Sequence, residues 1–144
     1  MTPDRPLISV IVPHLNQFEG LAACLASLDA QSLHRTLFEI IVVDNGSISL
    51  PEELTANRPG THLFVQSQPG PGPARNLGVQ NALGKILAFI DADCRAHPDW
   101  LRNALNSISS APQGTILGGD VRIWREDNNR FTAIEAYEAI FGYR

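Results

Sequence analysis

Short apolar runs, rich in β-branched residues, recur along the chain and predict the strands of a sheet. These runs cover residues 7–12, 38–43, 61–65 and 86–90. Continuous apolar runs of this length, without alternating polar positions, are typical of strands buried on both faces of a parallel sheet. A further short strand is expected at residues 115–117, with an extension to Ile123.

Between these runs, apolar residues spaced three and four apart predict helices. One such stripe runs from Phe18 to Leu28, with Asn16 as the N-cap of the helix. Further helical segments are expected at residues 52–56, at 74–83 with Pro73 in the first turn, and at 97–109. The alternation of strands and helices predicts an α/β fold with a mainly parallel sheet flanked by helices.

The last segment, residues 130–144, places its apolar side chains close to one face of a helix. An apolar helical face needs a partner that covers it. We therefore expect either a further part of the protein after residue 144 or contact with a second copy of the chain through this helix. Residues 1–144 are accordingly expected to form one domain of a longer protein.

The composition is that of an ordinary globular protein. Hydrophobic residues make up 44% and charged residues 18% of the chain, and no stretch approaches the roughly 18 apolar residues that a membrane span needs. The first residues lead into the short apolar run at 7–12 without the longer apolar region of a secretory signal, which predicts a cytoplasmic protein.

Charge and cysteine usage exclude further classes. The net charge is −4 and the 11 basic residues are scattered, so a nucleic-acid partner is disfavoured and attraction to anionic lipid is unsupported. The two cysteines, Cys24 and Cys94, are too few for a disulfide framework or a four-ligand zinc site.

Polar residues collect at the ends of the predicted strands, where an open α/β sheet binds its ligands. The first strand ends at residues 13–16 (Pro-His-Leu-Asn), the second at 44–47 (Asp-Asn-Gly-Ser) and the fourth at 91–93 (Asp-Ala-Asp). Arg75 lies in the first turn of the helix that follows a Gly/Pro loop. These segments predict a single binding site.

Asp91 and Asp93 are candidate metal ligands. They lie two residues apart, and because side chains alternate along an extended chain, both carboxylates can project to the same side. Two hard oxygen donors suit Mg²⁺ or Mn²⁺ and leave coordination positions open for water and phosphate. The alternative is an Asp that caps the next helix beside a solvated neighbour.

Asp44 and Arg75 suit the remaining parts of a nucleotide. A carboxylate at Asp44 can accept hydrogen bonds from a base N–H or from ribose hydroxyls, and the alternative is a plain turn residue. The guanidinium of Arg75 and the free N–H groups of its helix can face a diphosphate, and the alternative is a surface arginine. The glycines at 70, 72 and 78 do not fit the dinucleotide fingerprint, so NAD binding is rejected.

Four motifs, in this order and spacing, resemble those of the family 2 glycosyltransferases, which have the GT-A fold. They are residues 9–13 (SVIVP) with Asn16, 39–47 (EIIVVDNGS), 72–78 (GPARNLG) and 89–93 (FIDAD). The resemblance covers roughly residues 7–125. It implies an inverting, metal-dependent transfer of a sugar from a nucleotide diphosphate sugar to a hydroxyl of a glycan or lipid-linked acceptor.

Carried onto this sequence, the resemblance implies a nucleoside pocket at the first strand end, a base contact at the second, and an Asp-x-Asp site for ribose, Mn²⁺ or Mg²⁺ and diphosphate at the fourth. The donor-binding residues are then Pro13, His14, Asn16, Asp44, Asn45, Gly46, Arg75, Asp91, Ala92 and Asp93, with Asp91 and Asp93 at the metal.

The sequence departs from the family pattern at two of these positions. His14-Leu15 stands where the family usually has Thr-Tyr or a similar pair, and Asn45 stands where a second acidic residue often follows the first. The family's acceptor half, with its general base, is expected beyond residue 144, where the longer protein can also meet a membrane. Asp120 is the candidate base within this chain.

Two other functions stay open at this point. One is a non-catalytic module that binds a nucleotide sugar, and the other is a nucleotidyltransferase. A nucleotidyltransferase is expected to carry a Gly-rich, Lys-containing loop directly after its first strand, and residues 13–16 contain neither glycine nor lysine.

Overall fold

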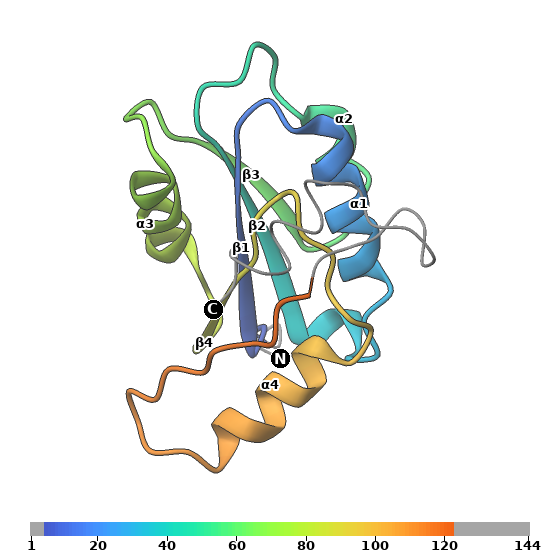
Figure 1. The fold of residues 1–144 in the computed structure, drawn as a ribbon, viewed down its shortest axis with the longest axis vertical. Coiled ribbons are helices and arrows are strands. Elements are labelled where there is room, and N and C mark those ends of the chain that lie inside the picture. The colour runs from blue at the N-terminus through green and yellow to red at the C-terminus, as the bar shows by residue number, and fades with distance from the viewer. Residues whose placement is uncertain (1–4, 123–144) are drawn as a thin grey trace. The chain divides into compact units, whose positions relative to one another are not determined.

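The computed structural model describes residues 5–122. The chain divides into two compact units, Met1–Ala111 and Pro112–Arg144. The first unit contains β1 (Ile8–His14), α1 (Phe18–Asp29), the 3-10 helix η1 (Arg35–Leu37), β2 (Phe38–Asp44), α2 (Glu52–Thr55), β3 (Thr61–Val65), α3 (Pro71–Asn81), β4 (Ile86–Phe89) and α4 (Trp100–Ser109) (Figure 1).

The four strands form one parallel sheet in the order β3-β2-β1-β4. All seven residues of β2 are buried, as are all residues of β1 except Pro13. This burial explains the continuous apolar runs of the two central strands. The register pairs His14 with Asp44 at the carboxyl ends of β1 and β2, so the two strand ends lie side by side.

Helices cover both faces of this sheet and make two separate cores. On one face, buried side chains of α1, including Leu21 and Leu25, pack against Val10 of β1 and Val42 of β2. On the other face, Ala74 of α3 packs against Ile11, Ile41 and Val43. Figure 1 shows α1 and α3 on opposite sides of the strands. The predicted α/β fold with a parallel sheet flanked by helices is confirmed.

Gly78 allows α3 to lie close to β1. A Cβ atom at this position would stand 2.5 Å from the Cγ2 atom of Ile11, whose side chain is fully buried. Only glycine fits this approach without displacing the sheet or the helix.

The prediction that the fourth strand is buried on both faces was wrong. β4 is an edge of the sheet in the described residues, and its burial alternates, with Leu87 39% and Phe89 46% exposed. An apolar run shows that a strand can be buried but does not show which neighbour covers it.

Other boundaries also differ from the predictions. Residues 115–117 form no strand, and the predicted extension to Ile123 and the predicted helix at 130–144 lie outside the described residues. α3 begins at Pro71, because prolines fit the first turn, where backbone N–H groups need no helical partner. No helix within residues 5–122 is long and apolar enough to cross a membrane.

Candidate functional site

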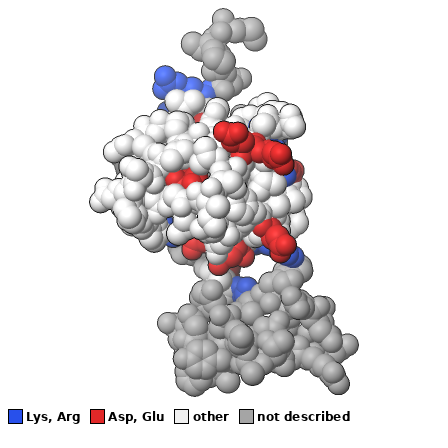
Figure 2. Space-filling view, turned by 90° about the horizontal axis from the view of Figure 1, so that it is seen from above, with Lys and Arg blue, Asp and Glu red and all other residues white. Residues whose placement is uncertain are grey.

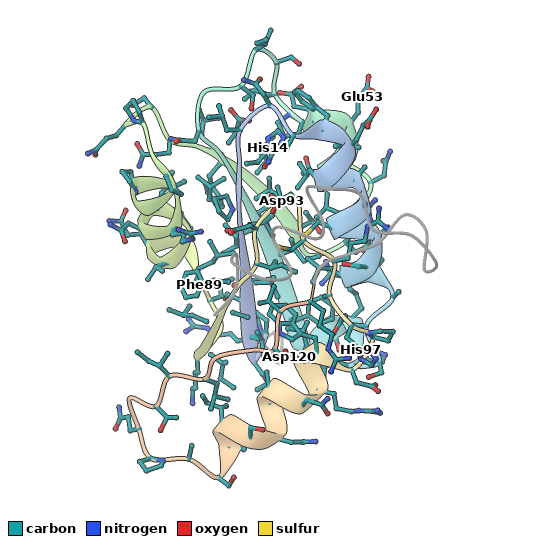
Figure 3. All side chains as sticks on the ribbon, in the orientation of Figure 1. His14, Glu53, Phe89, Asp93, His97 and Asp120 are labelled. Carbon is teal, nitrogen blue, oxygen red and sulfur yellow. The ribbon has the colours of Figure 1, made fainter. Side chains whose placement is uncertain are left out.

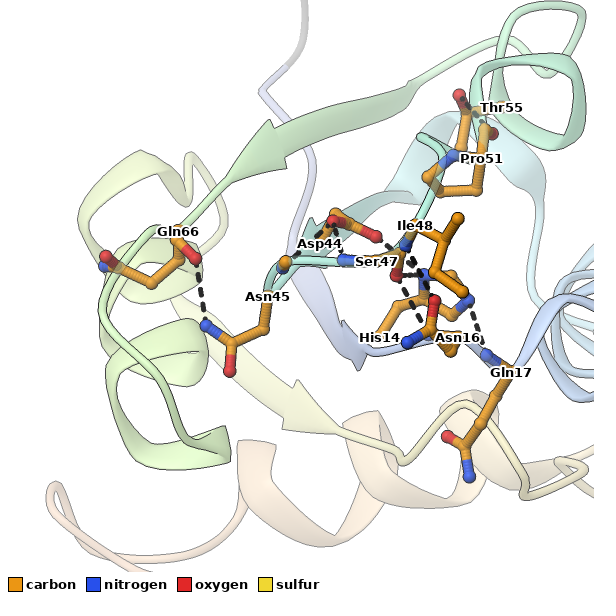
Figure 4. A network of polar contacts seen from close by, with 11 residues as sticks. His14, Asn16, Gln17, Asp44, Asn45, Ser47, Ile48, Pro51, Thr55 and Gln66 are labelled. Carbon is orange, nitrogen blue, oxygen red and sulfur yellow. Dashed lines mark hydrogen bonds and ion pairs between the residues drawn. The ribbon is translucent and has the colours of Figure 1, made fainter.

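His14 and Asp44 join the ends of the two central strands. The Nδ1 atom of His14 lies 3.0 Å from Oδ1 of Asp44, and its Nε2 atom accepts a hydrogen bond from the backbone N–H of Gln17 at 3.1 Å (Figure 4). Because Nε2 accepts, the ring proton is on Nδ1 and is donated to the carboxylate. His14 is 2% exposed and Asp44 is fully buried, so this pair is part of the framework beneath the site.

Asp44 also holds the turn that follows β2. Its Oδ2 atom accepts hydrogen bonds from the backbone N–H groups of Gly46 at 3.1 Å and Ser47 at 3.0 Å. Burial by itself raises the pKa of Asp44, but hydrogen bonds from Ser47, His14 and Gly46 outweigh it and leave the pKa below 3.8. The carboxylate is therefore ionised at neutral pH. Its predicted contact with a base stays a prediction, and both of its oxygens already have protein partners.

Asn16 joins the loop after β1 to the loop after β2. Its backbone N–H donates to Oγ of Ser47, and its Oδ1 accepts from the backbone N–H of Ile48, each at 2.8 Å. Asn16 adopts a φ of +52°, a left-handed conformation that asparagine tolerates better than most residues. The N-cap of α1 is Gln17, so the prediction that Asn16 caps this helix was wrong.

The side chain of Asn45 points to a third segment. It makes hydrogen bonds to the loop between β3 and α3, at Gln66, Gln68 and Gly70. Sequence reasoning placed Asn45 among the donor-binding residues and gave no sign of this loop contact. Gln17, which holds His14, was missed, and Ser47 was named only as part of the turn after β2, because the contacts of both depend on the register of β1 and β2.

Arg75 and Asp91 meet beyond the end of the sheet. The Nη2 atom of Arg75 on α3 lies 2.6 Å from Oδ1 of Asp91, which follows β4, and the two side chains are 35% and 55% exposed. Sequence reasoning predicted that these residues share a site, and the structure brings them into contact. An accessible guanidinium beside an accessible carboxylate can bind a phosphate and a cation at neighbouring positions.

Asp91, Ala92 and Asp93 form a turn, in which the backbone N–H of Cys94 donates to the carbonyl oxygen of Asp91 at 2.9 Å. The premise that this segment is extended was wrong. Asp91 and Asp93 are nonetheless both exposed, while Ala92 is buried. A Cβ atom at Gly20 of α1 would stand 3.1 Å from the carbonyl oxygen of Ala92, so α1 packs closely beneath the turn.

The donor set at this turn fits a divalent cation that is shared with a ligand. Within residues 5–122 no group of three or more His, Cys, Asp and Glu side chains gathers to hold a metal ion. Asp91 and Asp93 alone leave most positions of a six-coordinate Mg²⁺ or Mn²⁺ open for water and phosphate oxygens, as such ions prefer. Asp120 belongs to the second unit and makes an ion pair with Arg122 at 2.8 Å.

The surface over the strand ends is largely uncharged. Figure 2 shows the Asp and Glu side chains in separate groups on the side seen from above, with no continuous basic patch among the described residues visible there. Figure 3 shows His14 and Asp93 toward the upper end of the sheet and His97 toward the lower end. An open groove lies between the start of α1 and residues 49–54, but none of the predicted donor residues lines it. The candidate ligand-binding residues therefore lie beside Arg75 and Asp91 and not in this groove.

A parallel sheet with helices on both faces, and with carboxylates and an arginine beyond its strand ends, defines an α/β protein of the GT-A fold. The chain belongs to glycosyltransferase family 2: the model of the family described as Glycosyl transferase family 2 matches residues 9–143. This membership confirms the resemblance in the four sequence motifs and favours a glycosyltransferase over a nucleotidyltransferase.

Relatives and solved structures agree with this membership. Glycosyltransferase AglE of Haloferax volcanii is 33% identical over an alignment that covers 96% of this chain and 46% of that protein. The crystal structure of Staphylococcus aureus TarS 1–349 in complex with UDP-GlcNAc superposes with a TM-score of 0.65 at 29% identity, over 71% of this chain and 31% of that one.

The mannosyltransferase PcManGT from Pyrobaculum calidifontis, in complex with GDP-Man and Mn²⁺, superposes with a TM-score of 0.67 at 26% identity, over 74% of this chain and 33% of that one. The chain thus spans less than half the length of these proteins.

Proposed function

We propose that this chain forms the donor site of an inverting, metal-dependent glycosyltransferase, which transfers a sugar from a nucleotide diphosphate sugar to an acceptor hydroxyl. The observation that carries this proposal is the contact between Arg75 and Asp91 at 2.6 Å. This contact supports the proposal because a guanidinium suited to a diphosphate lies beside a carboxylate suited to a divalent ion, at the edge of the sheet where α/β proteins bind their ligands.

The exposed residues would hold the charged part of the donor. Arg75 would donate hydrogen bonds to the diphosphate, as an arginine fork commonly does. Asp91 and Asp93 would hold Mg²⁺ or Mn²⁺, and the bound ion would neutralise charge on the departing nucleoside diphosphate. The backbone of Ala92 would lie between these two carboxylates, against α1.

The residues at the ends of β1 and β2 would line the nucleoside. Pro13 and Asn16 bound one side of this region and Gly46 the other, while the buried pair of His14 and Asp44 keeps the two strand ends in register. The TarS structures contain UDP or UDP-GlcNAc and the PcManGT structure contains GDP-Man and Mn²⁺, which supports a nucleotide sugar with a divalent ion and leaves the base open.

The acceptor, a glycan or a lipid-linked molecule, would be bound mainly outside this chain, because the relatives are more than twice as long. The general base would then also lie in the longer protein. Asp120 stays the candidate base within residues 5–122, and it pairs with Arg122 in the second unit.

Calorimetric titration with UDP, GDP and dTDP, each with and without Mn²⁺, tests the donor site. We expect one nucleotide to bind in the presence of Mn²⁺, and Asp93→Asn to weaken its binding about tenfold or more, because a charged metal ligand is lost. Asp99→Asn is the matched control, since Asp99 is a partly exposed carboxylate paired with Arg102 on α4.

Two results would count against the proposal. Failure of the folded wild-type chain to bind any of the three nucleotides would contradict a donor site. Equal binding by wild type and Asp93→Asn would contradict the role of this carboxylate at the metal.

A further inference from the structure

The side chain of Asn45 is fully used in holding the segment that leads from β3 into α3. Its amide nitrogen donates to the carbonyl oxygens of Gln66 at 2.9 Å and Gln68 at 2.7 Å, and its amide oxygen accepts from the backbone N–H of Gly70 at 2.7 Å (the bond to Gln66 is drawn in Figure 4). We name residues 66–70 the β3–α3 segment. One side chain thus fixes both ends and the middle of this segment.

Asn45 itself is firmly placed. It follows Asp44, the last residue of β2, and its backbone N–H donates to the carbonyl oxygen of His14 at 2.8 Å, which extends the contact between β1 and β2. The β3–α3 segment is therefore attached to the two buried central strands of the sheet.

The chemistry of this contact requires an amide. Asparagine offers two N–H donors and one oxygen acceptor on the same short side chain, whereas an ionised aspartate offers only acceptors. Aspartate at position 45 would keep the bond from Gly70 but would turn an oxygen toward the carbonyl groups of Gln66 and Gln68. An aspartate at this position is thus incompatible with this arrangement of the segment.

The β3–α3 segment sets where α3 begins. It ends at Gly70, whose φ of +116° suits glycine, and α3 starts at the next residue, Pro71. Arg75 lies about one turn further along the helix and contacts Asp91. A displaced segment would move the first turn of α3 and with it the guanidinium group of Arg75.

We propose that Asn45 is a positioning residue of the donor site, which acts through the β3–α3 segment on Arg75 and does not contact the nucleotide base. This inference rests on the proposed function, because it assigns Arg75 to the diphosphate. It gives Asn45 a role different from the base contact that its place beside Asp44 suggests.

The test compares Asn45→Asp with the control Asn57→Asp, which introduces the same charge at an exposed position in the turn after α2. Binding of the nucleotide that the wild type takes up with Mn²⁺ is measured in the wild-type background and in the Arg75→Ala background. We expect Asn45→Asp to weaken binding about tenfold with Arg75 present and less than about threefold without it, because coupled residues are not additive. Asn57→Asp should leave binding unchanged in both.

If Asn45 only supported the fold, Asn45→Asp would lower the nucleotide affinity by the same factor in both backgrounds, and this result would overturn the inference. An unchanged nucleotide affinity of Asn45→Asp would overturn it as well. Hydrogen exchange of the Gly70 amide supplies a second readout that needs no nucleotide. We expect Asn45→Ala, which removes the acceptor of the Gly70 N–H, to speed exchange across residues 70–75 but not in α1. Unchanged exchange would refute the link to α3, whereas failure of the wild type to bind nucleotide would refute only the proposed function.

Discussion

Replacing Arg75 with alanine should change metal binding and nucleotide binding in opposite directions. The Nη2 atom of Arg75 lies 2.6 Å from Oδ1 of Asp91, the carboxylate that we assign to the metal. The ion and the guanidinium therefore compete for one carboxylate group. With the nucleotide bound, the same guanidinium is free to turn to the diphosphate.

The magnitudes follow from the exposure of the pair. The side chains are 35% and 55% exposed, and ion pairs that are so accessible to water contribute about 1 kcal/mol at most. Loss of this competition should tighten the binding of Mn²⁺ alone by up to about fivefold. Loss of a charge-assisted hydrogen bond to the diphosphate, about 1.5–3 kcal/mol, should weaken nucleotide binding by about tenfold or more.

Titration of Mn²⁺ alone, followed by titration of the nucleotide in saturating Mn²⁺, measures both effects on the same Arg75→Ala protein. Arg102→Ala is the matched control, because Arg102 of α4 makes an ion pair of the same 2.6 Å length with Asp99, the residue before this helix. It should change neither affinity. Weaker binding of Mn²⁺ by Arg75→Ala would refute the competition, and unchanged nucleotide binding would refute the contact with the diphosphate.

Three further predictions concern the framework around the site. Because hydrogen bonds hold its folded pKa below the usual value, ionised Asp44 stabilises the protein above its unfolded pKa, and this stabilisation is lost as the pH falls through the folded pKa. Asp44→Asn should cost about 2 kcal/mol in thermal melts at pH 7, and a cost that did not shrink as the pH was lowered would contradict this. Gly78→Ala should lower the free energy of unfolding in urea by about 1–2 kcal/mol, because the cost of overpacking against Ile11 exceeds the gain in helix propensity. A more stable variant would contradict this and show that α3 can move away from β1. Burial raises the pKa of Cys24 to about 12 and also raises the pKa of Cys94. A thiol reagent at pH 8 should therefore label half-buried Cys94 slowly and Cys24 only after unfolding, and rapid labelling of Cys24 would disprove its burial.

The central part of the fold could be predicted from the sequence because its signals are local. The apolar runs located β1 to within two residues and β2 to within one residue of their observed bounds, and β3 was predicted at its observed bounds, residues 61–65. The stripe that starts at Phe18 gave α1. The exposed face of β4 and the absence of a strand at residues 115–117 could not be predicted, because burial and pairing depend on neighbours that a local pattern does not contain.

The candidate site, like the fold, could be predicted from the sequence only in part. Strand ends and the rule for ligand binding in α/β sheets sufficed to place Arg75 and Asp91 together, although they are 16 residues apart. The contact of Asn45 with Gln66 spans 21 residues and could not be predicted, because it depends on the path of a loop. Asn45 was predicted from its place in the family motif, and only the structure shows which partners its amide has.

Burial separates the polar residues of this site into two groups with different freedom to move. His14 and Asp44 are buried, and every polar atom of their side chains is satisfied by the protein. Moving either would leave a buried polar group without a partner, which costs about 1–3 kcal/mol. Arg75 and Asp91 are partly exposed and are joined by one accessible contact, so exchanging it for a phosphate and a cation costs little. In the proposed donor site, the two central strands would thus provide a fixed wall for the nucleoside, while α3 and the end of β4 would provide side chains that can rearrange around the diphosphate and its ion.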